Sequence, residues 1–142
     1  MDDPHDLQRF IDAQSTVIDQ VRNELRAGRK RSHWMWFIFP QMKGLGFSEM
    51  ARRFGIASLA EGQAYLAHPV LGPRLRECTQ LVTAVQGKSA LEILGSPDDQ
   101  KFCSSLTLFA RATTDNQVFL DALNKYYRGT FDAATLKLLG ER

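Results

Sequence analysis

The sequence has no hydrophobic run long enough to cross a membrane. Its longest run, residues 34–39, spans six residues, whereas a membrane-spanning helix needs about 20. The opening residues, MDDPHD, are acidic and lack the basic and apolar regions of a secretory signal. We therefore expect a protein of the cytoplasm that has no membrane partner.

Cysteine and histidine are also scarce. The two cysteines, Cys78 and Cys103, lie too far apart in the sequence to form the Cys-x-x-Cys pair of a zinc or redox site. The three histidines, His5, His33 and His68, lack a ligand spacing such as His-x-x-x-His. We expect two reduced and buried thiols, no metal site and no cofactor.

Repeats, low-complexity stretches and linkers rich in proline, glycine or serine are absent as well. The length of 142 residues is that of one domain. Hydrophobic residues make up 44% of the chain and charged residues 24%, which is typical of a folded protein. The sequence predicts a single domain over residues 1–142, with fraying confined to residues 1–5.

Apolar residues recur throughout at helical spacing. A first stripe ends at Gly28, a residue that suits the end of a helix, and consists of Val17, Ile18, Val21 and Leu25. Later stripes use the same steps of three and four: Leu71, Leu75, Cys78, Val82 and Val85, then Phe102, Leu106 and Phe109, then Phe119, Leu123 and Tyr126. Alternation with a period of two is nearly absent, so no sizeable sheet is expected. The pattern predicts a compact all-α fold of seven to nine helices.

Helix starts are marked by four candidate capping residues, Ser58, Ser89, Ser96 and Asp132. The first two are each followed three positions later by glutamate, which is the capping-box pattern. The third is followed by proline, which suits the first helical position because its missing N–H costs nothing there.

The aromatic segment at residues 34–39 is the exception to this pattern. Its residues favour β-structure by propensity, but no second strand is evident to pair with it, and a lone strand would leave its backbone groups unpaired. We expect a short buried helix that ends before Pro40.

The same segment holds both tryptophans. A tryptophan buries a large area and its indole N–H needs a partner when enclosed, so Trp34 and Trp36 are either core anchors or stacking surfaces for a planar ligand. The loop that follows carries Gln41, Lys43 and Gly44, and its glycines allow the backbone to approach a ligand closely. Both interpretations remain open from the sequence.

A second distinctive stretch spans residues 98–109. At helical spacing Asp98, Lys101 and Ser105 fall on one flank of an apolar stripe, with Ser104 beside them. A lysine with hydroxyls one turn later, near a helix start, can hold a phosphate or a carboxylate. The same residues can equally form a salt bridge and satisfied hydroxyls in a helix–helix contact.

The long motifs of the chain carry a family resemblance. The runs SHWMWFIFPQ, GLG, AYLAHPVLGPRLREC and DDQKFCSSLTLF resemble the domain-of-unknown-function family 1810, small bacterial proteins, over essentially the whole chain. The resemblance implies a compact multihelical fold and brings no settled activity. Some members carry a calpastatin label, which does not suit this composition because that inhibitor is a disordered repeat protein. Leu106 stands where the family pattern has methionine, a volume-conserving change.

These residues define our first functional hypothesis, the binding or hydrolysis of a phosphate-bearing small molecule of the nucleotide or ADP-ribose type. In it Trp34 or Trp36 stacks on the base, Lys101 meets the anion, and His33 or Asp99 handles the proton. The ligand-binding set is Trp34, Trp36, Gln41, Lys43, Gly44, Lys101, Ser104 and Ser105. No metal is part of the site.

The alternative hypothesis is an interaction module without chemistry. Residues 22–53 contain eight basic and two acidic residues, a local excess of six positive charges. The basic residues are Arg22, Arg26, Arg29, Lys30, Arg31, Lys43, Arg52 and Arg53. Such a region can bind an acidic protein or nucleic acid, although cations near a helix end also favour the helix dipole. The overall pI of about 8.7 lies below the range that indicates nucleic-acid binding. A structural subunit of a larger complex is a third possibility.

Overall fold

The computed structural model describes residues 2–141, and within them the protein is all-helical. The all-α prediction is confirmed. The described residues form ten helices rather than seven to nine, because four of them have six residues or fewer and are too short to show a full apolar stripe. The helices are α1 (Gln8–Ser15), α2 (Ile18–Arg26), α3 (Met35–Ile38), α4 (Glu49–Phe54), α5 (Leu59–Ala67), α6 (Leu71–Thr83), α7 (Ala90–Leu94), α8 (Asp98–Ala112), α9 (Gln117–Tyr127) and α10 (Ala133–Leu138).

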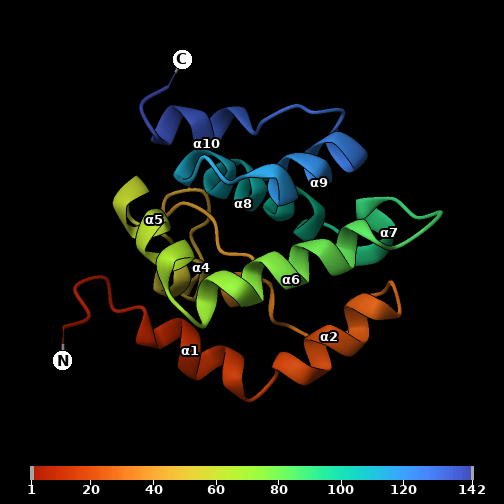
Figure 1. Ribbon diagram of the computed structural model, residues 1–142, viewed down its shortest axis with the longest axis horizontal. Helices are drawn as coiled ribbons and strands as arrows, with labels where there is room; N and C mark the ends of the chain where they lie inside the picture. Colours follow the sequence, from red (N-terminus) through yellow and green to blue (C-terminus); the bar gives the residue numbers. More distant parts are fainter. Residues whose placement is uncertain (1, 142) are drawn as a thin grey trace.

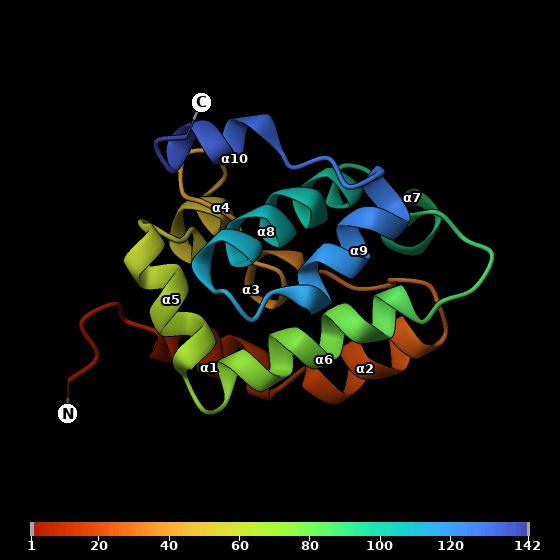
Figure 2. The ribbon, with the colours of Figure 1, turned by 45° about the horizontal axis from the view of Figure 1, so that its top comes forward.

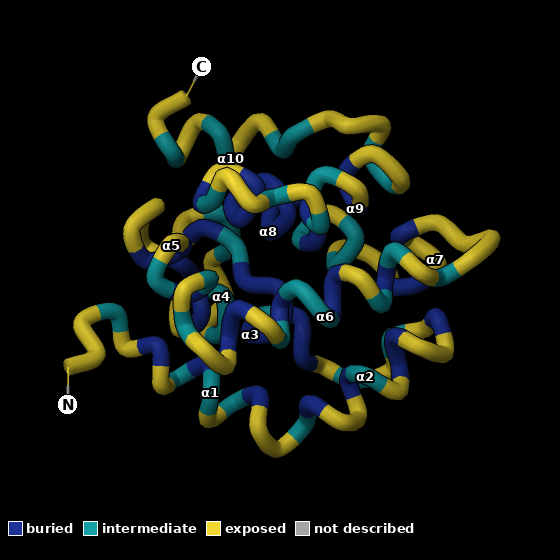
Figure 3. Tube along the Cα trace, in the orientation of Figure 1, coloured by how far each residue is buried: buried dark blue, intermediate teal, exposed yellow. Residues whose placement is uncertain are grey.

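Helix α8 is the centre of the molecule. It packs against α5, α7, α9 and α10, and ten of its fifteen residues are buried. Figure 2 shows α8 enclosed by these helices, and Figure 3 shows its trace as almost continuously buried. Helix α6 packs against α2, α5 and α9, and α1 and α2 form the lower edge of the view in Figure 1. The element that carries the predicted lysine-and-serine flank therefore forms the core of the fold.

The aromatic segment forms a short helix, as predicted. Helix α3 spans Met35–Ile38 and ends before Pro40. Its flanking aromatic residue Phe39 contacts Phe102 of α8 at 4.8 Å between ring centroids and Trp34 at 6.1 Å. Aromatic pairs at such distances add to the stabilisation from buried area. This segment is consequently anchored against the first half of α8.

The loop after α3 is fixed by a single parallel β-bridge between Met42 and Ile56. Lys43 N donates to the Ile56 carbonyl at 2.8 Å, and Ile56 N donates to the Gln41 carbonyl at 2.9 Å. The bridge joins the loop to the residues that follow α4. It is the one piece of β-pairing in residues 2–141, and it holds Gln41 next to α4.

Three of the four predicted capping residues are confirmed. The side chains of Ser58, Ser89 and Asp132 each accept a hydrogen bond from a backbone N–H of the first helical turn. The prediction for Ser96 is wrong, because α8 begins at Asp98 without a side-chain cap. The chain turns at Gly95, whose carbonyl accepts from Asp99 N, so Ser96 lies outside the position from which it could cap.

The start of the chain is held by side-chain hydrogen bonds. The carboxylate of Asp3 accepts from Leu7 N and Gln8 N at the start of α1, and the Arg9 guanidinium donates to the His5 carbonyl at 2.6 Å. Met1, part of the predicted frayed segment, lies outside the described residues.

Both cysteines are buried free thiols, as expected. Within residues 2–141 no helix is long and apolar enough to span a membrane. The same residues contain no group of three or more His, Cys, Asp or Glu side chains that could hold a metal ion.

Candidate functional site

Lys101 lies between two hollows at the surface of the first half of α8. The narrow hollow has a cavity volume of about 10 Å³ and is lined by Met35, Trp36, Phe39, Gln41, Ala51, Phe54, Gly55 and Lys101. The wider one has a volume of about 330 Å³ and is lined by Gln41, Leu45, Gly46, Pro97, Gln100, Lys101, Ser104, Asp132 and Ala134. Since Gln41 and Lys101 line both, we treat the two hollows as one site and call it the Lys101 cleft.

The charge of Lys101 is only loosely paired. Its Nζ lies 3.8 Å from Asp98 Oδ1, whereas Lys30 Nζ lies 2.9 Å from the other oxygen of the same carboxylate. Asp98 is therefore held chiefly by Lys30. The Lys101 side chain is 25% exposed, and an ammonium so placed can accept another anionic partner.

The ring of Trp36 packs against the ammonium group of Lys101. Lys101 Nζ lies 5.3 Å from the centroid of the Trp36 ring, a cation–π arrangement. The indole Nε1 of Trp36 is buried and has no hydrogen-bond partner among the described residues. A buried N–H donor without an acceptor is costly and uncommon in folded proteins. Trp36 also lines the narrow hollow, so the residue that carries this unpaired donor borders the cleft.

Ser104 and Asp132 also line the wider hollow, and they are joined to each other. Ser104 Oγ lies 3.2 Å from Asp132 Oδ2, and the same carboxylate oxygen accepts from Thr135 N at 3.0 Å and from Thr135 Oγ1 at 2.6 Å. Asp132 N donates to Thr107 Oγ1 at 2.9 Å. The carboxylate thus caps α10 and ties it to α8.

Of the residues expected from the sequence to bind a ligand, four line the Lys101 cleft. They are Trp36, Gln41, Lys101 and Ser104. Lys43 and Gly44 are exposed on the loop beside it and line neither hollow. Ser105 is only 1% exposed and lies in the interior. One residue along a helix turns a side chain by about 100°, which separates Ser105 from its neighbour Ser104.

Trp34 is a core residue. It is 2% exposed, and its indole Nε1 donates to Glu24 Oε1 at 2.9 Å. Burial by itself would raise the pKa of Glu24, but hydrogen bonds led by that from Ser32 outweigh burial and lower the pKa to about 2. A carboxylate enclosed in this way is a structural anchor, and Trp34 offers no free face to a ligand.

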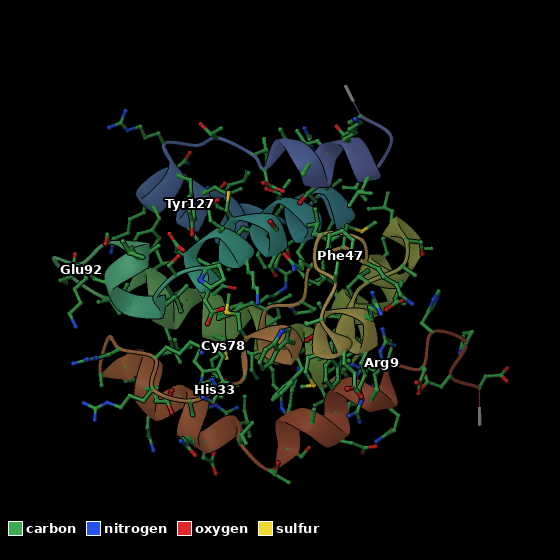
Figure 4. The ribbon with its side chains drawn as sticks, turned by 180° about the vertical axis from the view of Figure 1, so that it is seen from behind. Arg9, His33, Phe47, Cys78, Glu92 and Tyr127 are labelled. Atoms are coloured by element: carbon green, nitrogen blue, oxygen red, sulfur yellow. The ribbon has the colours of Figure 1, made fainter. Side chains whose placement is uncertain are left out.

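Neither of the two residues expected to move a proton lines the Lys101 cleft. His33 is exposed, and Figure 4 shows it beside α2, well apart from Phe47 on the loop before α4. Asp99 lies on the α9 side of α8, where its carbonyl accepts from the Tyr127 hydroxyl. One oxygen of the Asp99 carboxylate is buried without a partner among the described residues. Burial, reinforced by Cys103 and by this carboxylate, raises the pKa of Tyr127.

The structure divides the basic region of residues 22–53 into separate parts. Arg22 pairs with Asp19 and Glu77, and Lys30 pairs with Asp98. The exposed arginines of this region form two groups: Arg26, Arg29 and Arg31 at and just after the end of α2, and Arg52 and Arg53 on α4. Figures 1 and 2 show the end of α2 and helix α4 at opposite ends of the molecule. The charge excess counted along the sequence is not one continuous surface.

Sequence reasoning did not include Asp132 in the site. The residue was recognisable as a helix cap, but its position in the same hollow as Lys101 depends on the packing of α10 against α8. Glu24 was likewise missed, because nothing local to α2 indicates that an indole ten residues later will reach it.

The chain belongs to a family described as "Protein of unknown function (DUF1810)", whose pattern it matches over residues 4–139. This confirms the resemblance seen in its motifs. No curated protein matches the chain.

Among solved structures, the chain is similar to the crystal structure of the conserved hypothetical protein Rv1873 from Mycobacterium tuberculosis. The two share 61% sequence identity, with 99% of this chain and 100% of that chain covered, and the TM-score is 0.97. The fold described above is therefore also that of a bacterial relative.

Proposed function

We propose that this protein binds a phosphate-bearing small molecule in the Lys101 cleft. The observation that carries the proposal is the pairing of two unused donors: an ammonium only loosely bound to Asp98, at 3.8 Å, and the buried Trp36 indole N–H without an acceptor. Phosphate oxygens accept strong hydrogen bonds from such groups. Gln41, which lines both hollows, can donate through its amide.

The dimensions of the cleft support this kind of ligand. The narrow hollow of about 10 Å³ has room for roughly one atom of the size of a water oxygen, as a phosphate oxygen reaching toward Trp36 would require. The wider hollow of about 330 Å³ lies at the lower end of the range of small-molecule sites. A phosphate at the junction leaves space for the rest of a small molecule.

Our proposal is for binding rather than hydrolysis, and for a ligand held by its phosphate rather than by a stacked base. Trp34 is enclosed, and one face of Trp36 is covered by Lys101. The candidate proton-transfer residues His33 and Asp99 do not line the cleft.

Isothermal titration and thermal unfolding with inorganic phosphate, glycerol 3-phosphate and ribose 5-phosphate test this proposal. A ligand at 100 times its Kd stabilises the folded state by about 2.7 kcal/mol. Lys101→Met removes the charge but keeps the aliphatic stem over Trp36, and should weaken binding at least tenfold. Lys137→Met, on the exposed face of α10, is the matched control and should leave binding unchanged. Failure of all three phosphates to bind the wild-type protein would contradict the proposal.

The second candidate function is the binding of an acidic protein or nucleic acid at the end of α2. It is favoured by Arg26, Arg29 and Arg31, which are exposed and form no ion pair within residues 2–141. Such binding would weaken steeply as salt is raised and would survive Lys101→Met. Binding in the Lys101 cleft would instead be weakened by Lys101→Met.

A further inference from the structure

We infer that the phosphate-bearing molecule carries hydroxyl groups as well, and that Asp132 Oδ1 accepts a hydrogen bond from one of them. The ligand class is then that of sugar phosphates and polyol phosphates. This inference rests on the proposed function, and it assigns to Asp132 the selection of the ligand among phosphates.

The two oxygens of the Asp132 carboxylate differ in their surroundings. Oδ2 lies within hydrogen-bond distance of three donors, Ser104 Oγ, Thr135 N and Thr135 Oγ1. Oδ1 accepts no hydrogen bond from any group in residues 2–141, and it is accessible from outside the protein. Since Asp132 lines the wider hollow, this oxygen remains free to accept from a molecule in the hollow.

Asp132 is close enough to Lys101 for one small molecule to reach both. Ser104 follows Lys101 by three positions on α8, and residues at this spacing are neighbours on the helix surface. Ser104 Oγ lies 3.2 Å from Asp132 Oδ2. Both Lys101 and Asp132 line the same hollow of about 330 Å³. One small molecule that lies in this hollow can therefore contact both residues.

The signs of the charges require a donor on the ligand. A phosphate bound to Lys101 lies in the same hollow as the Asp132 carboxylate, and like charges repel. An alkyl chain next to that carboxylate would remove its water and offer nothing in return, which is unfavourable. A hydroxyl group satisfies the carboxylate oxygen and separates it from the phosphate. The cleft should consequently discriminate between phosphates that differ only in their hydroxyl groups.

Glycerol 3-phosphate and n-propyl phosphate are suitable probes, because both have a three-carbon chain and they differ in two hydroxyl groups. Isothermal titration of the full chain should give at least about tenfold tighter binding of glycerol 3-phosphate, the effect of one hydrogen bond to a charged acceptor. Asp132→Asn is the variant of choice. Asparagine caps helices as well as aspartate does, so its oxygen can replace Oδ2 toward Thr135 while its amide nitrogen replaces the acceptor Oδ1 by a donor.

In Asp132→Asn the preference for glycerol 3-phosphate should fall several-fold, because the amide N–H can donate to a ligand hydroxyl oxygen but forms a weaker hydrogen bond than the carboxylate does, while n-propyl phosphate binds as tightly as before or more tightly. Retention of the propyl phosphate affinity also shows that the variant is folded. Equal binding of the two probes by the wild-type protein, or equal weakening of both in Asp132→Asn, would overturn the inference and leave the proposed phosphate site intact. Binding of neither probe by the wild-type protein would overturn the inference, and the additional failure of inorganic phosphate and ribose 5-phosphate to bind would overturn the proposed function as well.

Discussion

Trp34 donates its indole N–H to the carboxylate of Glu24, and this 2.9 Å bond joins the residue before α3 to the last turns of α2. Glu24 also accepts from Ser32 through both backbone and hydroxyl, from Arg31 N and from Gln20. Glu24 is 6% exposed. The buried carboxylate thus fixes the chain between the end of α2 and the aromatic segment, and its removal should destabilise the fold.

Glu24→Gln should destabilise the protein by about 2–3 kcal/mol, because glutamine keeps the shape but turns one acceptor oxygen into a donor that faces other donors. The free energy of unfolding measured in urea checks this. Glu49→Gln, an exposed residue at the start of α4, is the matched control and should change the stability by no more than about 0.5 kcal/mol. Equal effects of the two substitutions would contradict the structural role of Glu24.

The contribution of Glu24 should depend on pH. Its pKa is about 2 in the folded protein against 4.5 for an unperturbed glutamate, so the folded state holds fewer protons on this group than the unfolded chain does. The stabilisation is complete above pH 4.5 and is lost as the pH falls toward 2. The difference in free energy of unfolding between wild type and Glu24→Gln should therefore shrink over this interval. A difference that stays constant between pH 5 and pH 3 would show that the carboxylate is not preferentially ionised in the fold.

The contrast between the two tryptophans illustrates what the sequence could and could not predict. Helical spacing correctly predicted an all-α fold and the short α3, because these depend on residues near one another in the chain. Local sequence does not distinguish Trp34 from Trp36, since the partner of Trp34 lies on α2 and the partner of Trp36 lies on α8. Which indole is enclosed is decided by tertiary packing.

The Lys101 cleft was likewise predictable only where it depends on residues close together in the sequence. The face of α8 that carries Lys101 and Ser104 was predictable from spacing along one helix. The depth at which Ser105 lies was not, because α8 is surrounded by four helices rather than lying at the edge of the core. Asp132 was predictable as a cap and unpredictable as a wall of the cleft, since only the docking of α10 brings it there.

Both thiols should be unreactive in the folded protein. Burial raises the pKa of Cys78 to about 12 and, as the largest cause, that of Cys103 to about 11, whereas the reactive species is the thiolate. Labelling with a disulfide reagent at pH 8 should be slow in buffer and should proceed at both residues after unfolding in guanidinium. Fast labelling of one thiol in buffer would indicate that the packing around it opens readily.

Substitution by phenylalanine should destabilise the protein much more at Trp34 than at Trp36. Trp34→Phe leaves Glu24 without one of its donors and opens space in the core, so it should cost about 2–4 kcal/mol of unfolding free energy. Trp36→Phe removes an N–H that has no acceptor among the described residues, and it retains a ring beneath Lys101, so its cost should stay below about 1 kcal/mol.

Affinity for inorganic phosphate should follow the reverse order. Trp36→Phe deletes a donor of the Lys101 cleft and should weaken phosphate binding several-fold, whereas Trp34→Phe should leave the affinity of the folded fraction unchanged. Urea unfolding and isothermal titration on both variants separate the two roles. If Trp36→Phe destabilised the protein as strongly as Trp34→Phe and left phosphate affinity intact, Trp36 would be a core anchor like its neighbour, and the unused indole N–H would carry no information about a ligand.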